Sequence, residues 1–234
     1  MKPKVVITGL GAVTPLGVGV GPLHERWAQG VCGIVDGAGS CSEFEPKEFL
    51  SVKEIRRLDR FSQLAVVASQ EALSQATLGD GLPYDPLRIG CVIATGIGGI
   101  ETVEAQHDVM RDRGAKSVSP LGIPQYMPNA GAAAVAMKFG LQGHTYGIVS
   151  ACSSGAHALG AATRMIQCGD AQAVVAGGAE ATLTAFGFAC FNSMQALSPT
   201  GVSRPFDARR DGFVMGEGAG VMVLEEESAA RARG

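Results

Sequence analysis

The sequence predicts an α/β fold in which a mostly parallel sheet is sandwiched between helices. Short apolar segments, typical of buried strands, alternate with segments whose apolar residues recur at helical spacing, and this order favours βαβ units. The strand-like segments show little alternation of apolar and polar residues, which is typical of a sheet covered on both faces. The chain of 234 residues is 46% hydrophobic and 18% charged, so a large core is expected.

In the first half of the chain, an apolar run at 4–8 predicts the first strand, and a short helix is expected at 22–28. The segment 59–78 predicts a longer helix, because its apolar residues recur three and four positions apart. An uninterrupted apolar run at 89–94 predicts the second strand. It ends at a glycine-rich turn, and a helix at 101–112 follows.

In the second half, an Ala-rich segment at 130–139 predicts a helix, and the apolar run at 145–149 predicts the third strand. A helix of small residues is expected at 153–167, with two further strands at 173–176 and 220–224 and a polar helix after the last strand. The glycines expected to end the two helices are Gly140 and Gly169. The segments predicted as long loops are 33–51 and 113–129.

Composition argues against several classes of protein. The net charge of −3 disfavours a nucleic-acid binder, which usually has a strongly basic domain. No segment has the apolar length of a membrane helix or a secretory signal, so we expect no membrane association and a cytoplasmic location. The six cysteines form no CxxC pair and no Cys/His cluster with metal-site spacing, so neither a metal site nor a disulfide framework is expected.

Cys152 is the residue best placed for chemistry. An apolar strand precedes it and a helix of small residues follows, so its thiol is expected at a helix N-terminus. The helix dipole and the N–H groups at that end favour a thiolate. Small neighbours leave room for an acyl group and supply an N–H as oxyanion donor. A buried, inert cysteine is the open alternative.

No histidine is expected beside Cys152 as an activating base. His157, five residues later on the helix, is expected to point away from the thiol, and His144 lies eight residues earlier along a strand. His24 and His107 fall in polar helical segments. Either the helix dipole alone activates the Cys152 thiol, or the activating side chains lie outside these residues.

The glycines near the start of the chain only partly match a dinucleotide-binding fingerprint. Gly9 and Gly11 follow the first predicted strand, but Thr14 stands where a third Gly or Ala is needed, and Pro15 follows it. A tight turn at the end of the strand is the favoured interpretation.

Seven motifs, each weak alone, occur in an order that resembles the β-ketoacyl-acyl-carrier-protein synthases of type II fatty acid or polyketide systems. They span nearly the whole chain: VITGLG at 6–11, GIGG at 96–99, SACSSG at 150–155, GD at 169–170, AGGAE at 176–180, ALS at 196–198, and SRPFD at 203–207 with RDGF and GEGAG up to 220.

The resemblance implies a thiolase-like fold built from two similar halves, with residues 1–234 as one N-terminal βαβαβαββ domain. Family members are about twice as long, and their second half carries two histidines, a lysine and a phenylalanine with no counterpart here. We therefore expect a truncated domain that is poorly soluble and inactive in condensation on its own.

Residue by residue, the resemblance makes Cys152 the nucleophile that takes an acyl chain from the phosphopantetheine arm of an acyl-carrier protein. Decarboxylative condensation with malonyl-carrier protein follows in the family. Ile97 and Phe191 fall where the family lines its acyl tunnel, and Phe213 falls near the nucleophile; ordinary packing is the alternative for each. No cofactor or metal is implied beyond the carrier's arm.

Two partners follow from the resemblance. Lys53, Arg56 and Arg57 form a basic cluster that would steer an acidic carrier protein, although such a cluster is often only a solvated face. A homodimer is implied, with the strand at 145–149 as its seam.

Other charged residues are interpreted as structural. A buried turn before the last strand is expected around Glu217, and the members of an expected ion network are Arg204, Asp207, Arg210 and Asp211.

Two other functions stay open: a non-catalytic fragment or dimerising, carrier-protein-binding module, and a thiolase-like enzyme acting on acyl-CoA. The presence of Cys152 argues against the non-catalytic sister subunits of polyketide systems, which have no cysteine there. Thiolases have a different sequence around their nucleophile.

Overall fold

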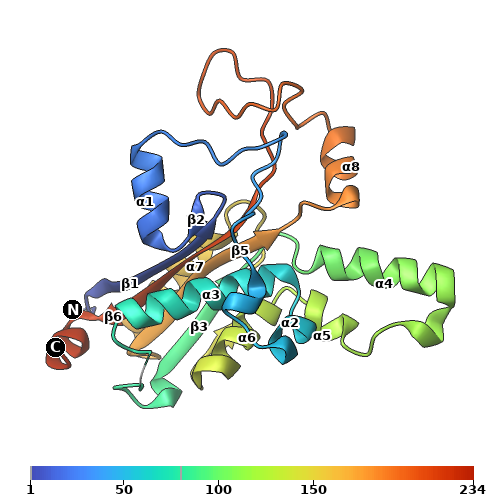
Figure 1. Cartoon of the computed structure of the whole chain (residues 1–234). Helices are drawn as coiled ribbons and strands as arrows, with labels where there is room; N and C mark the ends of the chain where they lie inside the picture. Colours follow the sequence, from blue (N-terminus) through green and yellow to red (C-terminus); the bar gives the residue numbers. More distant parts are fainter. Residues whose placement is uncertain (1, 80) are drawn as a thin grey trace.

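The computed structural model describes residues 2–79 and 81–234 and has one six-stranded sheet with helices on both faces (Figure 1). The strands, in their order across the sheet, are β2 (Gly17–Val18), β1 (Val5–Thr14), β6 (Glu217–Glu226), β5 (Ala173–Ala181), β3 (Ile89–Ala94) and β4 (Thr145–Tyr146). The predicted α/β class is confirmed.

Four of these strands run in the same direction. β3 is parallel to both β4 and β5, and β6 is antiparallel to its neighbours β1 and β5. β1 therefore runs with β3, β4 and β5, whereas β6 and the short β2 run against them. The sheet is mostly parallel in strand direction, as predicted, but the last strand inserts between the first and the fifth and creates two antiparallel pairs there.

Helices cover both faces of the sheet (Figure 1). The helices are α1 (Val20–Ala28), α2 (Val52–Arg57), α3 (Arg60–Gln75), α4 (Ile100–Arg113), α5 (Gly122–Tyr126), α6 (Ala130–Phe139), α7 (Ser154–Cys168), α8 (Ala185–Ser193) and α9 (Glu227–Ala232). Side chains that alternate along β3 and β5 divide between two cores: Cys91 and Val175 pack with α3 and α6, and Val92 and Val174 pack with α7.

Local signals explain where the main helices begin and end. The buried Asp59 side chain accepts the N–H of Phe61 and caps α3, and a capping box of Ser51 and Glu54 begins α2. α6 and α7 end at Gly140 and Gly169, which both adopt the left-handed conformation, as predicted. The segment 113–129, predicted as a loop, contains α5, so that prediction is wrong in part.

The strands differ most from the predictions. β1 continues to Thr14, so the expected turn at its glycines is wrong, and β5 and β6 are likewise longer than expected. β4 covers only Thr145–Tyr146 instead of 145–149. The glycines of β1 mark a close contact between elements instead of a turn: a Cβ at Gly9 would lie 2.0 Å from the Ala72 carbonyl oxygen, and one at Gly11 would lie 1.9 Å from that of Ala68. The backbone of α3 therefore lies directly on β1.

A buried carboxylate fastens the last helix to the sheet. Glu225, at the end of β6, is fully buried and accepts two hydrogen bonds from Arg233, at 2.6 and 2.8 Å, and one from the hydroxyl of Tyr84, at 2.5 Å. The hydroxyl of Thr8 in β1 also donates to it. No helix within residues 2–79 and 81–234 has the length and apolar character that crossing a bilayer requires.

Gly11→Ala tests the contact between β1 and α3. The added Cβ overlaps a helix carbonyl, so we expect the free energy of unfolding, measured by urea titration, to fall by about 3 kcal/mol. The control is Gly220→Ala in β6, where the position of a Cβ is open, and its loss should stay below about 1 kcal/mol. Equal losses in the two variants would contradict the packing argument.

Candidate active site

Cys152 lies on a sharp turn that leads into α7. The preceding residue, Ala151, has a φ of +50°, in the left-handed region that residues other than glycine rarely adopt. The thiol of Cys152 is exposed, and α7 begins two residues later, at Ser154. The structure thus places this cysteine just before a helix N-terminus, and the alternative of a buried cysteine does not fit.

Hydrogen bonds within the turn hold its shape. The N–H of Ser150 donates to Ser154 Oγ at 2.8 Å, and the Ser154 hydroxyl donates to the Ala151 carbonyl at 2.6 Å. Ser150 Oγ and His157 Nδ1 are 2.5 Å apart. We expected His157 to point away from Cys152; its ring bonds to Ser150, two residues before the cysteine, and none of the hydrogen bonds among the described residues joins it to the thiol.

The turn packs on β5 and is bonded to the residue that follows β3. A Cβ at Gly178 of β5 would lie 3.3 Å from the Cα of Gly155, so the first turn of α7 approaches the strand closely. The N–H of Thr95, which follows β3, donates to the Ile148 carbonyl at 3.2 Å. Ser153 makes no side-chain cap on α7, which leaves the N–H groups of the first turn without a capping side chain. The N–H groups of Ser153 and Ser154 donate to the carbonyls of Ser150 and Ala151, at 3.2 and 3.1 Å, so an anion at this helix end would have to bind N–H groups further along the first turn.

Glu180, at the end of β5, holds the glycine-rich loop beside this turn. Its carboxylate accepts the N–H of Gly96 at 2.7 Å, the N–H of Ile97 at 3.2 Å and the hydroxyl of Thr95 at 3.0 Å. Burial raises the pKa of Glu180 above its ordinary value, although these hydrogen bonds act in the opposite direction. Sequence reasoning gave Glu180 no role; the signal was an acidic residue within an otherwise apolar strand.

The three residues expected to contact an acyl chain fall in two places. Phe191 and Phe213 pack edge to face, with ring centroids 5.2 Å apart, and Phe213 lines a cavity of about 400 Å³ beside α8. Ile97 is 44% exposed and lies on the loop held by Glu180. In the described part of the chain, neither Ile97 nor Cys152 is among the residues that line that cavity. Their role in an acyl tunnel stays a prediction.

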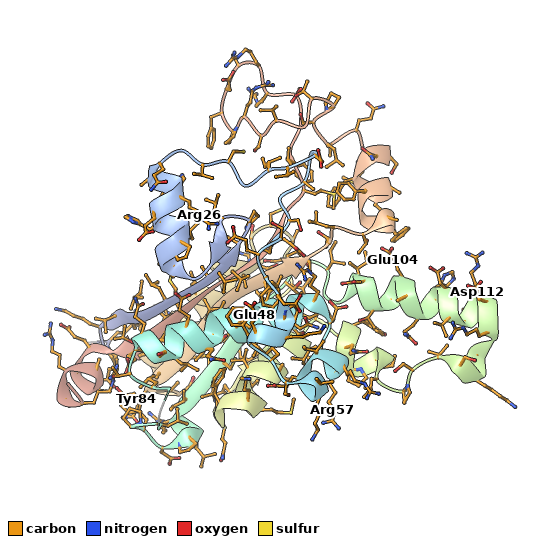
Figure 2. The ribbon with its side chains drawn as sticks, viewed as in Figure 1. Arg26, Glu48, Arg57, Tyr84, Glu104 and Asp112 are labelled. Carbon is orange, nitrogen blue, oxygen red and sulfur yellow. The ribbon has the colours of Figure 1, made fainter. Side chains whose placement is uncertain are left out.

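The basic cluster lies on the short helix α2. Lys53, Arg56 and Arg57 are exposed, and Figure 2 shows Arg57 at the outer side of the molecule. Glu54, the acidic residue of the same helix, pairs with Lys138 of α6 at 2.6 Å and not with a member of the cluster. This hydrogen bond, together with that from Ser51, lowers the pKa of Glu54 to about 2.

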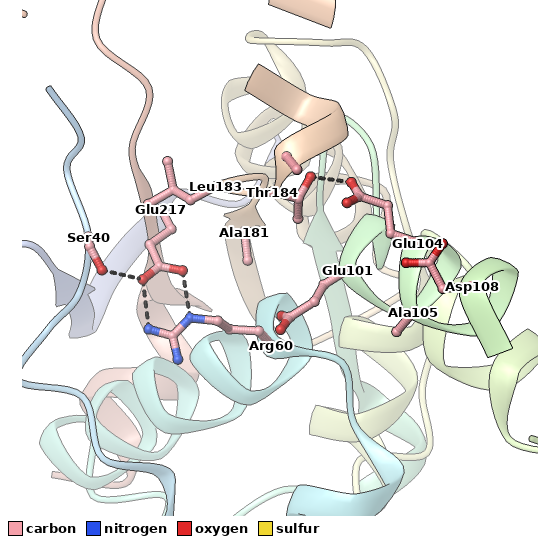
Figure 3. A pocket seen from close by; sticks show the side chains of 11 residues that line it. Ser40, Arg60, Glu101, Glu104, Ala105, Asp108, Ala181, Leu183, Thr184 and Glu217 are labelled. Atoms are coloured by element: carbon pink, nitrogen blue, oxygen red, sulfur yellow. Dashed lines mark hydrogen bonds and ion pairs between the residues drawn. The ribbon is translucent and has the colours of Figure 1, made fainter. Parts of the chain in front are cut away.

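An ion pair between the half-buried Arg60 and the buried Glu217 borders a cavity of about 530 Å³ between α3, α4 and the start of β6 (Figure 3). Arg60 donates two hydrogen bonds of 2.6 Å to the Glu217 carboxylate, which also accepts the N–H of Cys41 at 2.9 Å. Glu217 was expected in a turn, but it begins β6 as one half of this pair. Glu101 and Glu104 face the cavity from α4. Within residues 2–79 and 81–234, no three acidic, His or Cys side chains gather as a metal site requires.

The ion network expected near the end of the chain forms in part. Arg204 lies 3.9 Å from Asp211, but Asp207 pairs with Arg209, which was not predicted, at 2.9 Å. Arg210 donates to the backbone carbonyl of Asp207 instead of to a carboxylate.

Comparison with solved structures identifies the class of fold. A β-ketoacyl synthase from Burkholderia phymatum superposes on the whole chain with a TM-score of 0.85 at 31% sequence identity, and 61% of its own chain is covered. A chain in the solved complex of a type II PKS acyl-carrier protein with its ketosynthase, bound to the hexaketide, gives a TM-score of 0.83 at 26% identity, over 100% of this chain and 60% of that one. The fold is of the thiolase-like class that ketosynthases share.

Sequence comparison narrows this class to one family. Residues 2–230 match the family described as "Beta-ketoacyl synthase, N-terminal domain", and the chain belongs to it. A curated relative, the 3-oxoacyl-(acyl-carrier-protein) synthase 2 of Synechocystis sp., is 41% identical over 258 aligned residues, which cover 100% of this chain and 60% of the relative. The chain thus spans about 60% of the length of that relative.

Arg60→Met tests the ion pair between the half-buried Arg60 and the buried Glu217 carboxylate. It leaves the Glu217 carboxylate buried without its partner, and we expect the free energy of unfolding at neutral pH to fall by about 3 kcal/mol. Burial opposes ionisation of Glu217, but Arg60 and the surrounding donors outweigh it and hold its pKa below the ordinary value. The pair therefore stabilises the fold above the unfolded pKa of about 4.3, and this contribution is lost as the pH falls through the lower folded pKa.

Urea titrations at neutral pH and near pH 4 measure the loss of stability and its dependence on pH. The difference in free energy of unfolding between wild type and variant should be smaller at the lower pH. The control is Arg26→Met, which removes an equally short pair with the exposed Glu43. Its effect should be much smaller, because water and salt screen exposed pairs. A loss as large as that of Arg60→Met would contradict the role given to burial.

Proposed function

We propose that this chain carries the acyl-accepting site of a β-ketoacyl synthase that acts in fatty acid or polyketide chain elongation. Cys152 would take an acyl chain from the phosphopantetheine arm of an acyl-carrier protein. The observation that supports this most strongly is the exposed thiol on a strained turn at the start of α7. The names of the relatives add support, since they are 3-oxoacyl-(acyl-carrier-protein) synthases.

The proposed transfer is a thiol–thioester exchange. The Cys152 thiolate attacks the carbonyl carbon of the acyl thioester and forms a tetrahedral oxyanion, which we expect N–H groups in the first turn of α7 to stabilise. Collapse of the oxyanion breaks the bond to the pantetheine sulfur, which leaves as a thiolate and takes up a proton from solvent. The acyl group ends as a thioester on Cys152, and no oxidant or cofactor is consumed.

The condensation step is proposed for the whole protein. Malonyl-carrier protein would lose CO2, and the resulting carbanion would attack the acyl-Cys152 thioester, release the cysteine thiolate and form the 3-ketoacyl product. Histidines that promote such a decarboxylation were not found beside Cys152 in the residues described, where the imidazole of His157 bonds to Ser150. The chain spans about 60% of its relatives, so this step is assigned to the longer protein.

The two alternative functions receive less support. A non-catalytic, carrier-binding module gives no reason for an exposed cysteine on a strained turn. A thiolase-like enzyme acting on acyl-CoA is disfavoured because the curated relatives at about 40% identity are named for acyl-carrier protein. A cytoplasmic location and the absence of a bound cofactor stay predictions from the sequence.

We propose two partners. The solved complex of a related ketosynthase with its acyl-carrier protein supports carrier docking, for which the exposed Lys53, Arg56 and Arg57 would supply positive charge.

The second partner is another copy of this chain. Among the described strands, β4 lies at the edge of the sheet and pairs with β3 alone, while Tyr146 and Val149 near it are 38% and 54% exposed. An open strand edge of this kind favours pairing with a second strand.

Acyl transfer to Cys152 can be measured by mass spectrometry after incubation with acyl-carrier protein. We expect one acyl group per chain in the wild type and none in Cys152→Ala. Cys168→Ala is the matched control, because Cys168 is also exposed but lies at the opposite end of α7, and this variant should be acylated like the wild type. Equal acylation of Cys152→Ala would remove the assignment.

Charge reversal tests carrier docking. Replacing Lys53, Arg56 and Arg57 together by Glu should lower kcat/KM for acyl transfer from the carrier protein at least about tenfold, because the steering charge changes sign. Transfer from a small acyl thioester without the protein carrier should not change. Arg164→Glu, an exposed reversal on α7 across the sheet, is the control. A rate for the triple variant equal to that of this control would exclude docking at α2.

A further inference from the structure

Glu180 is a carboxylate aimed at backbone N–H groups instead of at a cation. Its Oε2 accepts the N–H of Gly96 and of Ile97, and its Oε1 accepts the hydroxyl of Thr95. Thr95 Oγ1 in turn accepts the N–H of Gly98 at 3.0 Å. One side chain therefore satisfies, directly or through one hydroxyl, the N–H groups of three successive residues. Successive N–H groups of this kind form a concavity that binds anions.

The glycines of the loop allow this contact. A Cβ at Gly96 would lie 2.8 Å from Glu180 Oε2, so any side chain there would push the carboxylate out. Gly98 has a φ of +88°, which turns the loop back towards Thr95. The shape of the loop thus depends on the carboxylate, and the carboxylate fits only because the loop has no side chain at Gly96.

The same loop lies against the turn that carries Cys152. The Cβ position of Gly96 is 3.7 Å from the carbonyl oxygen of Ala151, the residue with the strained φ. One residue earlier, the N–H of Thr95 donates to the Ile148 carbonyl. The loop therefore fills the space between Glu180 and the segment 148–151, and a shift of the loop would be passed on to the cysteine.

We propose that Glu180 is a positioning residue for acyl transfer: by filling the N–H concavity of residues 96–98, it fixes the loop that supports the strained turn at Ala151 and so orients the thiol of Cys152. This inference rests on the proposed function, because it assigns Glu180 a part in the transfer to that cysteine. Glu180 itself makes no contact with substrate in this role.

Replacing Glu180 should lower the rate of acyl transfer by an amount that depends on how many acceptor oxygens the new side chain keeps. In Glu180→Ala, two N–H groups and one hydroxyl lose their acceptor, so the loop is free to shift and the thiol is no longer held in line for attack. A misplacement of about 1 Å lowers such rates about 100-fold. Glu180→Gln keeps one acceptor oxygen for the N–H groups of Gly96 and Ile97, so it should recover most of this loss and remain within about tenfold of the wild type.

The matched control is Glu71→Ala. Glu71, on α3, also accepts two backbone N–H groups, from Ala12 at 2.9 Å and Val20 at 2.8 Å, but these belong to β1 and α1. The measurement is single-turnover acylation of the full chain by octanoyl-carrier protein, with hydrogen exchange of the peptide at 148–156 followed in the same variants. We expect the maximal rate to fall about 100-fold in Glu180→Ala, at an unchanged half-saturating carrier concentration, and exchange at 148–156 to rise in this variant alone.

Either of two results would overturn the inference: acylation by Glu180→Ala and Glu180→Gln as fast as by Glu71→Ala, or exchange at 148–156 no faster in Glu180→Ala than in the control. If the wild type takes up no acyl group, the proposed function fails, while the exchange comparison still decides whether Glu180 holds the turn. If Glu180→Ala does not fold, Gly96→Ala, whose Cβ would push the carboxylate out of the concavity, replaces it with the same expected results.

Discussion

The close approach of helix backbones to glycine positions in the sheet is the constraint on which the rest of the structure depends. α3 lies on Gly9 and Gly11 of β1, where a Cβ would meet helix carbonyl oxygens at 2.0 Å or less. On the other face, the start of α7 lies against Gly178 of β5. Interiors packed at this density leave helices almost no freedom to slide. The position of Cys152, just before α7, is therefore set by the sheet.

Buried carboxylates fasten both ends of β6, the strand that comes last in sequence but lies inside the sheet. Glu217 begins the strand and pairs with Arg60 of α3, and Glu225 near its end pairs with Arg233. Burial opposes the ionisation of both carboxyls, but their hydrogen bonds with arginine and neighbouring groups outweigh it, so each pKa lies below its ordinary value. Both pairs stabilise the fold above the unfolded carboxyl pKa and are lost as acid protonates the folded state.

What the sequence predicted depended on local signals. The observed bounds of β3 and α6 are the predicted ones. An uninterrupted apolar run marks β3, and the glycine after α6 marks its end, so both signals lie within or next to the element itself. The place of Cys152, on a turn just before a helix, was predicted because its strand, turn and helix are contiguous. The course of β1 through Gly9, the insertion of β6 and the pairing of Arg60 with Glu217 depend on partners far away in sequence. No local pattern encodes those partners, so the glycines were interpreted as a turn and Glu217 as a turn residue.

β5 combines these constraints at the candidate active site. Gly178 and Glu180 are two residues apart, so they lie on the same face of the strand, the face that α7 covers. Gly178 sets how closely the first turn of α7 approaches, and Glu180 sets the shape of the loop after β3. The turn at Ala151 and Cys152 lies between these two contacts. Because both come from one strand, the helix and the loop cannot move independently, and the strained backbone at Ala151 is held from both sides.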